Sequence, residues 1–174
     1  MLDFATVQGY DLHGAWELRS NHQSAIRSPA GQPVKPEFSA DAAINAWTSR
    51  GAPKSKLVLG IPLYGRGWTG VGRANRGLFQ PAAGPAPGTF EPGFEDYKKL
   101  KALTSQGYSL FRDTTAIHAW LFNGSTFWTF DDPAVLRAKT AYIKSKGIAG
   151  AMVWSLDGDD AGGSLIKAID RGLR

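Results

Sequence analysis

Residues 56–64 read KLVLGIPLY, a run that is apolar almost throughout after its first lysine. Continuous apolar runs of this length are typical of parallel strands, which are covered on both faces. A helix-like segment, FSADAAINAWTSRGAP, precedes the run at residues 38–53, and a short β-type segment, FATVQGY, lies earlier at residues 4–10. The order strand, helix, strand predicts a parallel βαβ unit.

Segment 38–53 carries the signals of a helix with defined ends. Ser39 is placed to cap its N-terminus, and a glycine followed by Pro53 ends it. Ile44 and Trp47 fall on one face of this helix, because residues three apart are neighbours on a helix surface. We therefore expect both side chains, Trp47 included, to lie on the core side.

A second unit closes the sequence. Asp132 and Pro133 fit the N-cap and first position of a helix, which Gly147 ends after two lysines. The strand IAGAMVWSL is predicted at residues 148–156, and a last helix at residues 164–173. The repeated order of strand and helix predicts an α/β fold, with a parallel sheet and helices packed outside it.

Residues 65–132 are too many for a loop between a strand and its helix. Glycine and proline punctuate their first part, a helix is predicted over residues 94–103, and a β run follows at residues 109–112. Another β run covers residues 117–130, with a turn at its Asn-Gly pair. This pattern predicts a small α+β insertion.

The composition excludes several classes of protein. The chain has 174 residues, of which 43% are hydrophobic and 20% charged, as in globular domains. Its net charge is +5, but the basic residues are scattered, so we expect no nucleic-acid partner. No apolar run approaches the roughly 18 residues of a membrane span. The absence of cysteine excludes disulfides and thiolate metal sites.

Aromatic residues stand beside hydrogen-bonding groups at the end of each predicted strand. In parallel α/β folds, binding residues collect at this edge of the sheet. A sugar ring offers C–H faces that stack on aromatic rings, and hydroxyl groups that pair with carboxylates and guanidinium groups. The three ends are Tyr10-Asp11 with Trp16 beyond, Tyr64-Gly65-Arg66, and Trp154 followed by Asp157, Asp159 and Asp160.

The same residues have plain structural interpretations. Each aromatic ring could be a core side chain, and Asp157 to Asp160 could form a solvated loop that caps the final helix. His13, His22 and His118 lack metal-ligand spacing, so we interpret them as structural and expect no metal site and no cofactor.

Several strings together resemble the carboxyl-terminal part of bacterial-type family 18 glycoside hydrolases, the chitinases. The strings are VQGYDLHGAWE, KLVLGIPLYGRGW, GTFEPGFEDY and FWTFDDPAVLRAKTAYIKSKGIAGAMVWSLDGDD. The resemblance implies that residues 1–66 and 133–174 are the last three strand-helix units of a (β/α)8 TIM barrel. It also implies that residues 67–132 are the chitinase insertion domain, one wall of the substrate cleft.

The resemblance implies roles for individual residues. Tyr10 and Asp11 match a strand end at which the tyrosine hydroxyl donates to the acetamide oxygen of the sugar and the aspartate helps to position it. Trp154 matches the indole beneath the ring that is distorted before cleavage. The remaining expected sugar contacts are Trp16 under the leaving-group sugars, Tyr64 and Arg66 along the chain, and Glu91 in the insertion domain.

Two departures from the family pattern bear on activity. Gln8 stands where the family usually has methionine, and the Asp-x-x-Asp-x-Asp-x-Glu pattern that carries the catalytic acid is absent. A barrel needs about 200 residues or more, so we interpret the chain as part of a chitinase. Its expected partners are chitin or N-acetylglucosamine oligomers, and the missing amino-terminal half or a second copy.

Other interpretations stay open. The chain could be a non-catalytic chitin-binding module, or a packing unit whose role is to assemble with its missing half. The resemblance implies a secreted protein, although the first ten residues lack the pattern of a signal peptide, so that signal would belong to a longer precursor.

Overall fold

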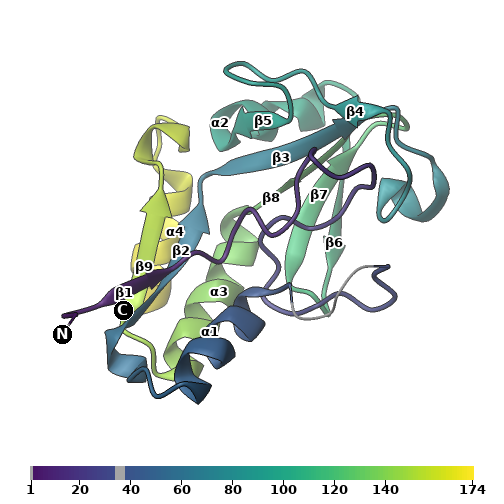
Figure 1. The fold of residues 1–174 in the computed structure, drawn as a ribbon. Coiled ribbons are helices and arrows are strands. Elements are labelled where there is room, and N and C mark those ends of the chain that lie inside the picture. The colour runs from purple at the N-terminus through teal and green to yellow at the C-terminus, as the bar shows by residue number, and fades with distance from the viewer. Residues whose placement is uncertain (1, 34–37) are drawn as a thin grey trace.

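The predicted parallel sheet is present in the computed structural model, which describes residues 2–33 and 38–174. Within these residues its strands are β1 (Ala5–Val7), β2 (Leu57–Pro62) and β9 (Gly150–Trp154). β2 lies between the other two and is parallel to both (Figure 1). β1 and β9 therefore each have an edge that no described strand pairs.

The helices α1 (Ala40–Ser49), α3 (Pro133–Lys146) and α4 (Ser164–Leu173) pack against this sheet (Figure 1). Their buried apolar side chains meet those of β2, whose Leu57, Leu59 and Ile61 are fully buried. This arrangement confirms the α/β fold class, and the open parallel sheet with its outer helices fits part of a TIM barrel.

The helix ends are those that the sequence predicts. The Ser39 hydroxyl accepts a hydrogen bond from the Ala42 amide at 3.1 Å. The Asp132 carboxylate accepts from the amides of Ala134 and Val135, just after Pro133 starts α3. Gly147 ends α3 in the left-handed conformation, with φ of 69°, which glycine adopts without a Cβ penalty.

The second sheet is antiparallel and holds the strands between β2 and α3. The β runs predicted near residues 109–112 and 117–130 are confirmed, with the turn at Asn123-Gly124. The order is β4 (Gly84–Pro85), β3 (Tyr64–Thr69), β8 (Phe127–Phe130), β7 (His118–Phe122) and β6 (Ser109–Asp113), with β5 (Phe94–Asp96) also beside β3. The short helices are α2 (Tyr97–Leu100) and the 3-10 turns Lys54–Lys56, Ala74–Gly77, Lys101–Ser105 and Leu156–Gly158.

Strand β3 was not expected from the sequence, in which glycine and proline punctuate the residues after Tyr64. Its glycines do not make turns but let neighbouring groups come close. A Cβ on Gly67 would lie 2.3 Å from a ring atom of Trp128, so the indole rests directly on the β3 backbone. The helix predicted over residues 94–103 is also shorter, because its first residues pair with β3 as β5.

The predicted core position of Trp47 is wrong. The buried residues of α1 are Ala40 and Ile44, whereas Trp47 is 47% exposed. The last turn of α1 lies near the first residues of β1 and β2, where Trp47 lines a hollow with Leu2 and Pro53. Nothing described there covers the indole.

The loop before α4 is only partly solvated. Asp157 is exposed, but Asp159 is buried and its carboxylate accepts from the amides of Leu165 and Ile166 at 3.0–3.1 Å. Asp160 accepts from Ser164 and pairs with a lysine of the neighbouring 3-10 turn. The predicted capping of the last helix is confirmed, and the prediction that all of these carboxylates are solvated is wrong for Asp159.

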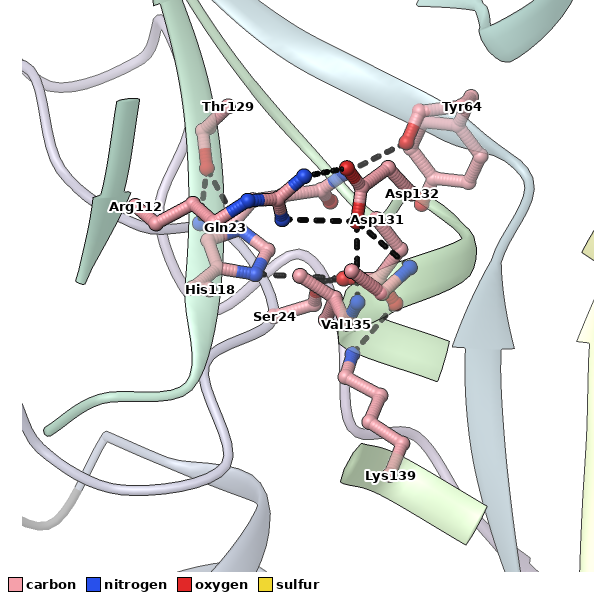
Figure 2. A network of polar contacts seen from close by, with 11 residues as sticks. Gln23, Ser24, Tyr64, Arg112, His118, Thr129, Asp131, Asp132, Val135 and Lys139 are labelled. Carbon is pink, nitrogen blue, oxygen red and sulfur yellow. Dashed lines mark hydrogen bonds and ion pairs between the residues drawn. The ribbon is translucent and has the colours of Figure 1, made fainter. Parts of the chain in front are cut away.

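Charged groups are buried where the second sheet meets α3 (Figure 2). Asp131 and Lys139 are fully buried and pair at 2.5 Å. Asp131 also accepts from the Ser24 hydroxyl at 3.0 Å and lies 3.2 Å from Nδ1 of the equally buried His118. A buried pair of this kind needs further hydrogen-bonding partners, and the Ser24 hydroxyl supplies one of them to Asp131.

Burial lowers the pKa of His118 from 6.5 to about 4; Asp131 opposes the shift, while the neighbouring His22 and Lys139 add to it. The pKa of His22, which faces Asp113 at 3.5 Å, is lowered by burial as well. Both rings are therefore neutral in the folded protein at neutral pH.

We predict that acid destabilises the fold between about pH 6.5 and pH 4. The unfolded chain takes up a proton on His118 in this window and the folded chain does not. The free energy of unfolding should therefore fall by about 1.4 kcal/mol per pH unit for this residue. Urea unfolding of wild type and His118→Gln at about pH 7 and about pH 5 measures it. The variant should show the flatter dependence, and equal pH dependence in both proteins would contradict the prediction.

Candidate carbohydrate-binding site

The carboxyl ends of the parallel strands lie together at one edge of the sheet. Pro62 of β2 is opposite Trp154 of β9, and the Leu63 amide donates to the Trp154 carbonyl at 2.8 Å. The Tyr10 ring, just beyond β1, lies over Gly60, where an added Cβ would come within 2.8 Å of it. Tyr10 and Tyr64 make an edge-to-face contact at 6.1 Å. The predicted strand-end aromatics thus gather at this edge.

Arg66 joins the parallel sheet to the second sheet. Its guanidinium donates two hydrogen bonds of 2.8 Å to the two carboxylate oxygens of Asp11. A third bond, of 3.0 Å, goes to Glu91. The Asp11 pair is the better shielded, because the Glu91 side chain is 60% exposed. A bidentate pair fixes both direction and distance, so it sets the orientation of β3 against the end of β1.

Aromatic rings surround the same guanidinium. Its central carbon lies 5.3 Å from the ring centres of Trp16, Tyr64 and Phe94. Tyr64 and Phe94 also stack on each other at 4.5 Å. Trp16 is 60% exposed, so one part of its indole contacts Arg66 and the rest remains open to a ligand.

The loop that carries Trp16 is held from both sides. The indole of Trp68 in β3 donates to the Glu17 carbonyl at 2.9 Å, and the Glu17 carboxylate lies 3.0 Å from Nδ1 of His13. Gly93, with φ of 81°, lies so close to Ala15 that an added Cβ would approach it within 2.9 Å. These contacts give the exposed indole a fixed support.

Burial and charge keep the phenols of the site protonated. Burial raises the pKa of Tyr10; a contact with Gln8 opposes this shift and the Asp11 charge adds to it. The pKa of Tyr64 is raised mainly by burial and further by Asp11. For Arg66, burial alone would lower the pKa, but the hydrogen bonds and charge of Asp11 outweigh it and raise the value. The site therefore offers neutral hydroxyl donors beside a permanent cation.

The structure brings together most of the residues expected from the sequence. Contacts around Arg66 connect Asp11, Trp16, Tyr64 and Glu91, and Tyr10 joins through Tyr64. Trp154 stands at the same edge and is 59% exposed, but among the described residues no ring contact or side-chain hydrogen bond links it to the others.

Phe94 and Gln8 also lie beside residues of the candidate site. Phe94 was not expected as part of the site, although it lies in the quoted string GTFEPGFEDY. Its place close to Glu91 in that string is the sequence signal that could have indicated it. The Gln8 amide nitrogen lies 3.5 Å from the Tyr10 hydroxyl, at the limit of a hydrogen bond.

The described residues include no group of histidine and carboxylate side chains that could hold a metal ion. His13, His22 and His118 are all buried and each has a carboxylate neighbour. Within the residues that the structure describes, no helix is long and apolar enough to cross a membrane.

A family model described as "Glycosyl hydrolases family 18" matches residues 1–159. The chain belongs to this family. It is 39% identical to chitinase 63 of Streptomyces plicatus over 99% of this chain and 27% of that protein. The catalytic domain of chitinase B from Arthrobacter TAD20 superposes with a TM-score of 0.90 at 39% identity, covering 99% of this chain and 39% of that one.

A chitinase structure that contains a ligand is also similar. It is a class V chitinase mutant from Nicotiana tobaccum in complex with NAG4, with a TM-score of 0.90 and 28% identity over 99% of this chain and 49% of that chain. This chain spans about a quarter of the length of the curated chitinases it matches first.

The two carboxylates on Arg66 should differ in their contribution to stability. Asp11→Asn keeps a residue that tolerates the φ of 54° at this position, so it removes the charge alone. We predict a loss of about 1 to 2 kcal/mol, below the upper part of the roughly 1.5 to 3 kcal/mol range of hydrogen bonds to charged groups, because the Asp11 side chain is 34% exposed. Glu91→Gln should lose under about 0.5 kcal/mol, because exposed pairs contribute little. Urea midpoints compare the variants, and equal losses would show that the pairs are equivalent.

Proposed function

We propose that this chain forms part of the sugar-binding cleft of a chitinase and binds β-1,4-linked N-acetylglucosamine chains. The observation that carries the proposal is the cluster around Arg66. It combines an exposed indole, phenol hydroxyls and a fixed cation at the carboxyl edge of a parallel sheet. Stacking faces and directed hydrogen bonds are what a pyranose chain requires. Membership of family 18 and the likeness to a chitinase bound to NAG4 support it.

In this proposal residues 1–66 and 133–174 belong to the barrel, and residues 67–132 form the insertion domain. The second sheet, which lies mostly within residues 67–132, supports the division. Tyr64, Arg66 and Trp16 would contact the sugar chain with Glu91, and Trp154 would lie beneath the ring at the cleavage point. We also expect a secreted protein, as the resemblance to the family implies.

The chemistry proposed for this cleft is substrate-assisted and retaining. Family 18 departs from the usual use of two carboxylates, since the acetamide oxygen of the substrate attacks the anomeric carbon while one glutamic acid protonates the leaving oxygen. Tyr10 fits the donor to that acetamide, because its hydroxyl stays protonated. Asp11 fits a positioning role, because both its oxygens already accept from Arg66.

The acid itself is proposed to lie on polypeptide outside this chain. A general acid must hold a proton near neutral pH and reach the leaving oxygen. Both oxygens of Asp11 already accept hydrogen bonds from Arg66, and no other carboxylate matches the family's acid pattern. The edges of β1 and β9 that no described strand pairs would receive the missing half of the barrel, or a second copy, as exposed strand edges favour pairing.

The same engagement of Asp11 favours a second candidate function, a binding module that holds chitin without cleaving it. The two functions share one cleft and differ in turnover. Oligomer binding tests the cleft, and hydrolysis separates the two functions.

Trp154→Ala should weaken binding of an N-acetylglucosamine oligomer by about 1 to 3 kcal/mol, through loss of a stacking surface. Trp47→Ala is a matched control, since Trp47 is similarly exposed but lies at the other end of the sheet. Titration calorimetry measures both affinities. Equal weakening by both substitutions, with folding intact, would place the cleft elsewhere.

The chain alone should release no measurable product from a chromogenic chitobioside. Activity should appear when a segment that carries the family's acidic strand is supplied. In that complex Tyr10→Phe should lower turnover roughly 10²-fold to 10³-fold, as loss of one donor to developing charge does. Hydrolysis by the 174-residue chain on its own, abolished by Asp11→Asn, would refute the assignment of the acid to another segment.

A further inference from the structure

From the buried charges at α3, a chain of hydrogen bonds runs toward β3, the strand that carries Tyr64 and Arg66 (Figure 2). Nε2 of His118 lies 2.7 Å from the Thr129 hydroxyl. That hydroxyl accepts from the Gln23 amide N–H at 3.3 Å. The side-chain amide of Gln23 then donates to the Tyr64 carbonyl at 2.7 Å. A continuous path thus runs from Lys139 and Asp131 to the first residue of β3.

The directions of these bonds are mutually consistent for a neutral His118. With its proton on Nδ1, the ring faces the Asp131 carboxylate at 3.2 Å and its Nε2 accepts the Thr129 hydroxyl proton. The oxygen of Thr129 then keeps lone pairs for the Gln23 amide. His118, Gln23 and Thr129 are all buried, so each bond is shielded from water.

Two residues of this path contact β3. Gln23 holds the backbone of Tyr64, which stacks on Phe94 and faces Arg66. Thr129 of β8 is the direct cross-strand partner of Arg66. The path therefore fixes β3 at the residues that carry the ring and the guanidinium of the site.

We propose that Gln23, Thr129 and His118 are positioning residues that hold Tyr64 and Arg66 in the geometry for sugar binding. This inference rests on the proposed function only for its effect on sugar affinity. That the three residues hold β3 in place does not depend on the proposed function. None of the three has to touch the sugar. They act through the backbone and register of β3.

The test compares two buried threonines that lose only a hydroxyl. Thr129→Val breaks the path between His118 and Gln23. Thr140→Val is the control, because Thr140 is equally buried in α3 and its hydroxyl bonds only within that helix. Thr129→Ser restores the hydroxyl. Peptide-resolved hydrogen exchange reports on residues 64–69 without ligand, and titration with tri-N-acetylchitotriose reports affinity.

We expect Thr129→Val to speed exchange at residues 64–69 and to weaken sugar affinity, each roughly 5-fold to 10-fold beyond Thr140→Val, the effect of one lost buried hydrogen bond. Thr129→Ser should behave like wild type. Equal exchange at residues 64–69 in both valine variants overturns the inference, whether or not sugar binds.

Sugar binding separates failure of the inference from failure of the proposed function. If Trp154→Ala weakens affinity and Thr129→Val does not, the path has no positioning role for the sugar. If the wild type binds no oligomer at all, the proposed function fails, and faster exchange in Thr129→Val alone would then support only the structural part of the inference.

Discussion

The bidentate pair between Arg66 and Asp11 holds the two halves of this structure in register. Arg66 belongs to the antiparallel sheet, and Asp11 follows the first strand of the parallel sheet. The extended segment that runs from β2 into β3 would leave the second sheet free to pivot if it were the sole link. A bidentate bond, supported by stacked rings, restricts that motion and assembles the candidate cleft as it does so.

Buried charge plays a comparable part behind the candidate site. Asp131, Lys139 and His118 lie at the join of α3, β7 and β8, where apolar side chains of similar size would give comparable stability. Removal of one partner would leave a buried charge uncompensated, at a cost of about 3 to 5 kcal/mol. Such a group tolerates few alternative arrangements, so it specifies how the second sheet docks on the helices.

The sequence was most informative where local rules decide the outcome. Ser39, Asp132 and Gly147 cap helices because their side chains or backbone satisfy free groups at helix ends, which needs no knowledge of distant residues. The apolar run at β2 predicted a covered strand for the same reason. The aromatic strand ends also predicted which residues would gather in the candidate site.

The errors arose where distant segments decide the outcome. The glycines of β3 give no strand signal in the sequence, and distant groups explain them: the Trp128 indole packs on Gly67, and Leu100 and the Thr129 carbonyl lie close to Gly65. Trp47 has the spacing of a core residue, but it lies in the last turn of α1 and is 47% exposed. The sequence did not indicate the hydrogen bonds of Gln23, because its partners lie about forty and a hundred residues away in sequence.

The central claim is that the edge formed by Tyr10, Arg66 and Trp154 binds N-acetylglucosamine chains. Each of the six tryptophans gives its own indole N–H signal in a ¹⁵N spectrum, so a titration with tri-N-acetylchitotriose locates the ligand directly. The account predicts that the signals of Trp16 and Trp154 shift with a common dissociation constant while that of Trp47 stays in place. A titration that shifts Trp47 and leaves Trp16 and Trp154 unchanged would contradict it.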